Sequence, residues 1–147
     1  MESPENLQLA VPFFMVSSMD DSLQFYTGRL GFRILRQWTP RGKIEWCWLQ
    51  RDGVSLMLQE PRDPEKKAEQ EKGTGVSICF QCRDALALYH EFSNHGVSVN
   101  EPFVGNGMWV VCCKDPDGYR LDFESPTDVA EETRYSEWKK ANHANQP

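Results

Sequence analysis

The acidic residue Asp122 is the side chain whose position in this sequence most directly suggests chemistry. It lies in KDPDGYRLDF, residues 114–123, where a Pro-Asp-Gly turn precedes a short strand. If the strand points Asp122 inward, Arg120 and Glu124 share its face, because alternate residues of a strand point to the same side. An inward carboxylate can hold a metal, act as a general base if burial raises its pKa, or attract a cationic ligand.

The cysteines add no obvious nucleophile or metal site to this acid. There are five of them, an odd number. Cys79 and Cys82 match a CxxC pattern, but they fall in a predicted strand, where an odd spacing places the two thiols on opposite faces. The same argument separates Cys112 from Cys113. The start, MESPENLQ, lacks the pattern of a secretory leader, so we expect reduced thiols and a cytoplasmic protein.

The histidines also lie away from Asp122. His90 and His95 fall in or just after a predicted helix, and His143 falls in the C-terminal stretch. A serine nucleophile needs a base within hydrogen-bond reach, and Ser77 has no histidine partner on a predicted strand. We therefore predict no catalytic residue, although the sequence does not exclude an enzyme.

Two segments of similar design divide the chain into halves. They are DSLQFYTGRLGF (21–32) and DALALYHEFSNHGV (84–97). Each begins with Asp, has apolar residues at helical spacing and runs to a glycine, which is the pattern of a capped helix. Each helix follows one apolar strand and precedes three. The expected strands are 9–17, 32–38, 44–50 and 54–59 in the first half, and 75–82, 97–103, 108–114 and 119–125 in the second.

This order predicts an α+β fold of two tandem βαβββ units. We expect a single domain spanning residues 1–147. Its parts are unit one at about 8–60, a charged linker at 61–74, unit two at about 75–125 and a C-terminal extension at 126–147. The linker is either a solvated connection or a lid over a pocket, and the extension adds a helix at about 128–140.

A duplicated βαβββ unit that closes on a DPDG turn resembles the vicinal oxygen chelate superfamily. This group includes glyoxalase I, extradiol dioxygenases, fosfomycin-resistance enzymes and bleomycin-resistance proteins. The resemblance implies that the two units form a curved mixed sheet around a cleft, with the helices outside. The resemblance covers roughly residues 8–125, and its most telling matches are DSLQFYTGRLGF and KDPDGYRLDF. Metal-dependent members place four ligands, usually His or Gln and Glu, at matched positions of the two units. The resemblance puts these positions at Val11, Met57, Ser77 and Asp122.

These four residues form a poor set of metal ligands. Val11 has no donor atom, and the thioether of Met57 is too soft for Mg, Mn or Fe(II). A shift of two residues brings in Gln59 or Glu124, but no histidine. We therefore expect neither a metal nor another cofactor.

An apolar, aromatic cleft with a few polar groups is the general form of a small-molecule site. The sequence is similar in this respect to bleomycin-resistance proteins, which lack a metal, form dimers and sequester a flat, cationic drug between aromatic and acidic groups. Five tryptophans are many for this length. The side chains expected to bind a ligand are Phe13, Met15, Trp46, Trp48, Met57, Gln59, Ser77, Trp109, Asp122 and Glu124, with Glu45 as a further acid.

The leading hypothesis is therefore a metal-free protein that sequesters a planar or cationic organic ligand and forms a homodimer. A glyoxalase- or dioxygenase-like enzyme with an altered metal set around Gln59, Ser77 and Asp122 or Glu124 is the alternative. A third possibility is a subunit whose cleft is filled by its own side chains and whose role is assembly. The net charge of −6 argues against nucleic acid or an anionic membrane as the partner, and no apolar run is long enough to cross a membrane.

Overall fold

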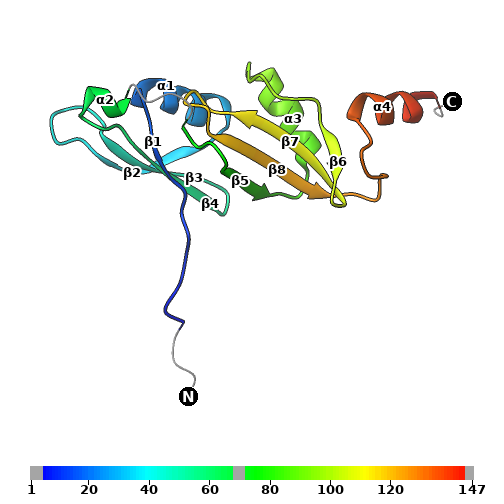
Figure 1. The fold of residues 1–147 in the computed structure, drawn as a ribbon, viewed down its shortest axis with the longest axis horizontal. Coiled ribbons are helices and arrows are strands. Elements are labelled where there is room, and N and C mark those ends of the chain that lie inside the picture. Colours follow the sequence, from blue (N-terminus) through cyan, green and yellow to red (C-terminus); the bar gives the residue numbers. More distant parts are fainter. Residues whose placement is uncertain (1–4, 68–71, 145–147) are drawn as a thin grey trace.

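The first half of the chain forms a four-stranded mixed sheet with a helix on one side. A computed structural model describes residues 5–67 and 72–144 of the chain. The sheet has the order β1-β4-β3-β2, with β1 parallel to β4 and the other pairs antiparallel (Figure 1). Its elements are β1 (Phe13–Met15), α1 (Met19–Leu23), η1 (Gln24–Arg29), β2 (Arg33–Trp38), β3 (Trp46–Arg51) and β4 (Val54–Gln59).

The second half repeats this design in a second sheet, which has the order β5-β8-β7-β6. The predicted α+β fold of two tandem βαβββ units is thus confirmed. The two sheets lie side by side and do not close into a barrel (Figure 1). The remaining elements are α2 (Pro64–Lys67), β5 (Ser77–Gln81), α3 (Ala85–Asn94), β6 (Phe103–Gly105), β7 (Met108–Lys114), β8 (Arg120–Pro126) and α4 (Tyr135–Ala144).

The two repeated helices begin differently. Asp84 caps α3 as predicted, since its carboxylate accepts from the backbone N–H of Ala87. The first helix begins earlier than predicted, because Ser18 rather than Asp21 is the capping residue and its hydroxyl accepts from the N–H of Asp21. Both helices are followed by a glycine with positive φ, Gly31 at 80° and Gly96 at 82°.

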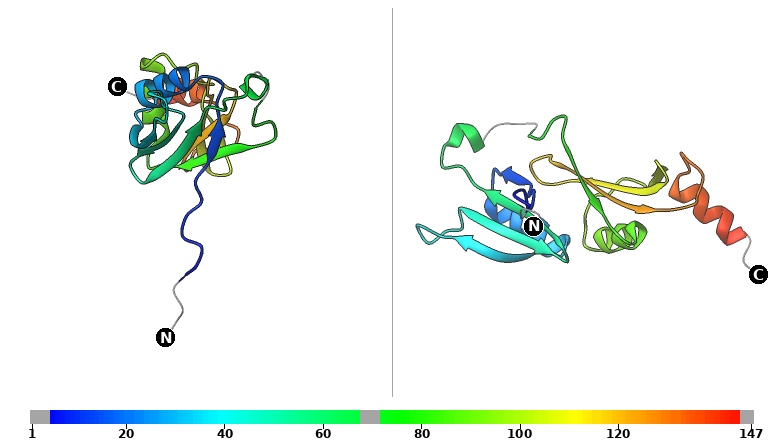
Figure 2. Two further views of the ribbon diagram at one scale, coloured as in Figure 1. Left: turned by 90° about the vertical axis from the view of Figure 1, so that its left-hand side faces the viewer. Right: turned by 90° about the horizontal axis from the view of Figure 1, so that it is seen from below.

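Each sheet buries one face against the helices. In the first sheet Leu56 and Leu58 of β4 have no exposed surface, and in the second sheet Leu121 of β8 has none. Phe123 of β8 packs edge-on against Phe92 of α3, with 5.0 Å between ring centroids. These side chains belong to one hydrophobic core that runs through both halves. Figure 2 (left) shows the helices gathered on one side of the sheets.

The two halves are joined by contacts between this helix side and the DPDG turn. The Tyr26 hydroxyl donates to the buried carboxylate of Asp115 at 2.8 Å. The ring of Tyr119 stacks on Phe14 of β1, with centroids 4.2 Å apart. The junction is therefore built from aromatic packing and buried hydrogen bonds, which favours a fixed arrangement of the two sheets.

The structure differs from the predicted boundaries in three further places. β1 is shorter than the predicted strand 9–17, because only Phe13–Met15 pair with β4. The N–H of Met57 on β4 also donates to the carbonyl of Pro12, and the segment before Pro12 forms no strand and leads away from the body (Figures 1 and 2). β6 begins only at Phe103, after Pro102, which has no N–H to give to a sheet. The last helix begins at Tyr135 rather than near residue 128. Part of the predicted linker, residues 68–71, lies outside the described residues.

Candidate ligand-binding site

Each sheet has a second face that packs against none of the helices in residues 5–67 and 72–144, and we call it the open face. On the first sheet the register of the strands places side chains in rows on this face, since paired residues of neighbouring strands point to the same side. One row contains Trp38, Trp46, Gln59 and Met15. The next row contains Arg36, Trp48, Met57 and Phe13.

These rows bring together all six first-sheet residues that the sequence predicted for ligand binding. Phe13 is 45% exposed and Trp38 is 50% exposed, so large apolar groups of this face meet solvent. Trp46, Trp48 and Met57 are half-buried. The first open face is therefore an aromatic and thioether floor with Gln59 as its main neutral polar group.

The open face of the second sheet is polar. Ser77, Cys79 and Gln81 of β5 are the register partners of Arg120, Asp122 and Glu124 of β8, and Cys112 of β7 pairs with Asp122 from the other side. The prediction that Ser77, Asp122 and Glu124 share a face is confirmed by this register. The two open faces therefore have the same topology but opposite character.

Trp109 does not belong to either open face. It pairs with Ser125 on β8 and lies on the helix side, where its ring packs edge-on against Tyr135 and Trp138 of α4. It is 5% exposed. The predicted role of Trp109 in ligand binding is corrected accordingly, because the sequence could not show which face of β7 the C-terminal helix covers.

Asp122 is a hydrogen-bonded, ionised acid rather than a poised base. Ser77 donates to its Oδ2, and the Arg120 Nε donates to its Oδ1 at 3.2 Å. Burial by itself raises the pKa of this carboxyl, but hydrogen bonds from Ser77, Cys112 and Arg120 outweigh burial and hold the pKa below its ordinary value. The condition set for a general base, a raised pKa, is therefore not met.

The two thiols beside Asp122 are equally unsuited to nucleophilic chemistry. Cys79 is exposed as a residue, but partial desolvation of its thiol raises the pKa to about 11, and the neighbouring Glu124 adds to the rise. Burial also raises the pKa of the Cys112 thiol to about 11, with a further contribution from Asp122. A thiol with such a pKa is protonated at neutral pH and reacts slowly. All five cysteines are free.

Two cavities border the first open face. One, of about 530 Å³, lies where the two sheets adjoin and is lined by Trp48 and Ser55 of the first sheet and by Cys79 and Gln81 of the second. The indole Nε1 of Trp48 is buried and has no hydrogen-bond partner among the described residues. This cavity connects the aromatic floor to the polar open face within one chain.

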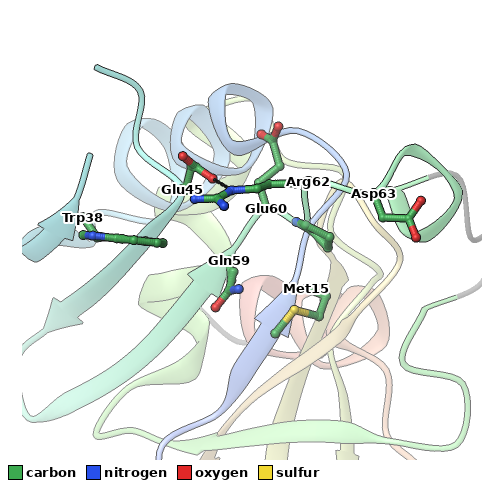
Figure 3. A pocket seen from close by; sticks show the side chains of 8 residues that line it. Met15, Trp38, Glu45, Gln59, Glu60, Arg62 and Asp63 are labelled. Atoms are coloured by element: carbon green, nitrogen blue, oxygen red, sulfur yellow. Dashed lines mark hydrogen bonds and ion pairs between the residues drawn. The ribbon is translucent and has the colours of Figure 1, made fainter. Parts of the chain in front are cut away.

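The other cavity, of about 610 Å³, lies at the end of the first sheet (Figure 3). Met15 and Gln59 form its floor, Trp38 forms one wall, and Glu45, Glu60, Arg62 and Asp63 line its upper side. The Arg62 Nε donates to Oε1 of Glu45 at 2.7 Å, and the Arg62 guanidinium carbon lies 5.7 Å from the centre of the Trp38 ring. Arg41 binds the same carboxylate at 3.2 Å.

The two buried acids of this cavity have different surroundings. Glu60 accepts from the backbone N–H of Met19 at 2.7 Å and from Lys43 at 2.8 Å, so it stabilises the start of α1. The carboxylate of Glu45 accepts hydrogen bonds from Arg41 and Arg62, and the hydrogen bond from Arg62 is the main reason that the pKa of this carboxyl is lowered. Of the two, Glu45 is the acid available to a ligand.

Sequence reasoning placed Arg62 in the charged linker and gave it no role. The composition of the linker does not single out Arg62, because acidic and basic residues are mixed there without helical or strand periodicity. One feature of the sequence could have indicated its place: Arg62 lies three residues after Gln59, whose side chain is part of the cavity floor. The chain that leaves β4 therefore passes over the end of the sheet.

The side chains of the open faces do not fit a metal centre of the kind that the family resemblance suggested. Phe13 is the register partner of Met57 in the first sheet, and Cys79 is the partner of Asp122 in the second. Within residues 5–67 and 72–144, no three His, Cys, Asp or Glu side chains are grouped so that they could hold a metal ion.

No helix in these ranges is long and apolar enough to cross a membrane.

Comparison with known proteins places this geometry in a family. Residues 8–123 match the model of the Glyoxalase/Bleomycin resistance protein/Dioxygenase superfamily. The protein YurT of Bacillus subtilis (strain 168), which has no assigned function, is 34% identical over 99 residues, which cover 63% of this chain and 77% of YurT.

Solved structures share the fold at lower identity. TnmS3, an antibiotic binding protein from Streptomyces sp. CB03234, has a TM-score of 0.62 and 20% identity over 84% of this chain and 100% of its own. A bleomycin-binding protein complexed with bleomycin has a TM-score of 0.63 and 22% identity over 81% of this chain and 98% of its own. The two tandem units, their DPDG turn and these matches together show that the chain belongs to the Glyoxalase/Bleomycin resistance protein/Dioxygenase superfamily.

Proposed function

We propose that the protein binds a planar organic molecule on its open faces and sequesters it without a metal or chemical step. The observation that carries this proposal is the aromatic floor of the first sheet, where Trp46, Trp48 and Phe13 share one face that no helix covers. Large exposed apolar groups of this kind mark binding surfaces in soluble proteins. The floor stacks on a flat ring system, and the acids of the second sheet attract positive charge.

The comparisons support a binding role. One structural neighbour is an antibiotic binding protein, and another was solved with bleomycin bound. The side chains of the polar open face also give little support to catalysis. The lowered pKa of Asp122 makes it a weak base, and the raised pKa of each neighbouring thiol keeps that thiol protonated. The five free thiols suit a reducing compartment such as the cytoplasm.

We propose further that the working form is a homodimer in which a second copy covers the open faces. Beyond the floor itself, Leu35 is 46% exposed, Val76 is 59% exposed and Phe103 is 40% exposed. Arg36 lies on the first open face and Glu124 on the second. In a dimer with a two-fold axis, the first open face of each copy would lie against the second open face of the other copy. This arrangement would bring Arg36 of one copy near Glu124 of the other.

Tryptophan fluorescence tests the binding proposal. A broad panel of planar antibiotics and metabolites, including bleomycin, is titrated into the purified protein, with the Trp138→Phe variant as the control because Trp138 packs on the helix side. We expect saturable quenching by at least one compound, unchanged in the control. Native mass spectrometry of protein purified without chelator should show no stoichiometric metal. A bound metal that is lost in Asp122→Ala would favour the enzyme alternative.

Sedimentation velocity tests the dimer. Phe13→Glu places a charge on the first open face, and we expect it to convert a dimer to a monomer. Gln24→Glu is the matched control, because Gln24 is an exposed residue of η1 on the helix side. A wild-type protein that sediments as a monomer at tens of micromolar would refute this part of the proposal and leave ligand binding to be judged by the fluorescence titration.

A further inference from the structure

The cavity at the end of the first sheet already contains an organic cation, which is the side chain of Arg62. Its guanidinium lies between the carboxylate of Glu45 and the ring of Trp38, as Figure 3 shows. An acid and an aromatic face that hold one planar cation form a recognition site for others of the same shape and charge. The arrangement is therefore a binding site that the chain fills with its own residue.

Arg62 is held loosely compared with the groups that it contacts. Its side chain is 57% exposed, whereas the Glu45 side chain is 11% exposed. It lies in the segment between β4 and α2, outside any strand, and its single hydrogen bond to Glu45 uses only Nε. Water competes for contacts of an exposed arginine, so little free energy is lost when the side chain swings out.

Glu45 and Trp38 are positioned more firmly than Arg62. The backbone N–H of Glu45 donates to the carbonyl of Trp38 at 3.0 Å, and Glu60 donates in turn to the carbonyl of Glu45 at 3.0 Å, so the sheet ladder continues through both. If Arg62 leaves, Glu45 keeps its contact with Arg41, which is not among the residues that line the 610 Å³ cavity. The acid and the ring thus remain in place for a replacement.

We propose that Trp38 and Glu45 form a subsite for the planar cationic group of the ligand, a guanidinium or amidinium, and that Arg62 occupies this subsite in the free protein and is displaced on binding. The inference rests on the proposed binding function and names the chemical class of its ligand. The cavity volume of about 610 Å³ suits a drug-sized molecule. From the subsite, the row of Trp46, Gln59 and Met15 leads across the floor, so the ligand's ring system lies next to its cationic end.

Benzamidinium and its neutral counterpart benzamide test the subsite, because they share size and planarity and differ in charge. We expect benzamidinium to bind the wild-type protein, and to bind Arg62→Ala about fivefold to tenfold more tightly since the competing cation is gone. Benzamide should bind both proteins equally within about twofold. In Glu45→Gln the preference for the charged compound should disappear.

Arg41→Ala is the matched control, since it removes an arginine from the same carboxylate without clearing the face of Trp38. We expect it to change the affinity for benzamidinium by less than about threefold. An equal gain in Arg41→Ala and Arg62→Ala would show a general charge effect and overturn the proposal. Unchanged or weaker binding to Arg62→Ala would also overturn it. Circular dichroism and thermal melts confirm that each variant is folded.

The Arg62 Nε–H resonance separates this proposal from the proposed function. The resonance is identified as the one that is missing from the spectrum of Arg62→Ala. We expect it to shift as benzamidinium saturates the wild-type protein. If a planar antibiotic quenches tryptophan fluorescence but neither cation nor antibiotic moves this resonance, the subsite is refuted while the binding function stands. If benzamidinium displaces Arg62 but no compound of the panel binds, the subsite stands and the sequestration proposal fails.

Discussion

The two sheets have the same strand order and the same helix-covered face, but their open faces differ in kind. The first presents rings and thioethers, such as Trp48 and Met57, and the second presents short polar groups, such as Ser77 and Cys79. On the hidden side, by contrast, Leu58 and Leu121 have equivalent surroundings and no exposed surface. The fold therefore requires similar residues on one face of each unit and leaves the other face free for recognition.

The comparison also separates two uses of charge. On the second open face Asp122 is satisfied by its own neighbours, Ser77 and Arg120. At the end of the first sheet Glu45 is satisfied by arginines from outside the strands. A carboxylate bound by side chains of its own sheet contributes to stability, while one bound by side chains from segments outside the strands can change partners.

Truncation of a buried leucine on the helix-covered face should have the largest effect on stability, and this effect should be similar in both sheets. We expect Leu58→Ala and Leu121→Ala each to lower the free energy of unfolding by about 2–5 kcal/mol, because each leaves a cavity in a fully buried layer. Urea denaturation measures the change. On the open face, Cys79→Ala should cost less than about 1 kcal/mol because Cys79 is exposed. A cost for Cys79→Ala close to that of the leucines would mean that the two faces are not distinct.

Ligand affinity should distinguish the two open faces. For a compound that quenches the wild-type protein, we expect Trp48→Ala to weaken binding by about tenfold or more, equal to about 1.4 kcal/mol, since a stacking surface is lost. Ser77→Ala should weaken it by less than about threefold. Isothermal titration calorimetry provides both values, and Trp138→Phe serves as the control. A larger loss in Ser77→Ala would assign recognition to the polar face instead.

The smallest effect should be the pH dependence contributed by Asp122. Because the folded-state pKa of Asp122 is lowered, its contribution to stability is complete above its ordinary pKa near 4 and is lost as the pH falls through the lower folded value. We expect Asp122→Asn to be less stable than wild type by about 1 kcal/mol near pH 6, and this difference should shrink below about pH 3. Urea midpoints at both pH values measure it. A difference that does not depend on pH would mean that Asp122 acts through packing rather than charge.

Much of the fold could be predicted because the two halves repeat a local pattern. The segments that begin at Asp21 and Asp84 predict two helices, and strict alternation in 119–125 and 54–59 assigns side chains to faces correctly. The turn at Asp115–Gly118 also follows from residue type, and Gly118 donates to the Asp115 carbonyl at 3.0 Å. Each of these signals depends on residues close together in the chain.

The errors come from interactions between distant residues. The sequence predicts Trp109 in the cleft because nothing local shows that Tyr135 and Trp138 cover the opposite face of β7. The lowered pKa of Asp122 depends on Ser77, which is 45 residues away in the chain. The part played by Arg62 depends on where the segment after β4 turns, which composition does not reveal. The position of the Arg62 guanidinium between Glu45 and Trp38 therefore depends on contacts between segments that lie apart in the chain.

The contact between Trp109 and Trp138 gives the molecule an optical signature. The two indoles are 5.6 Å apart at an angle of 71°. Two chromophores held this close at a fixed, oblique angle couple their strong electronic transitions and produce paired bands of opposite sign in far-ultraviolet circular dichroism, where the intense indole band lies. Because both rings lie on the side away from the floor, these bands report whether the C-terminal helix is in place, while the emission of the other tryptophans reports what occupies the opposite side.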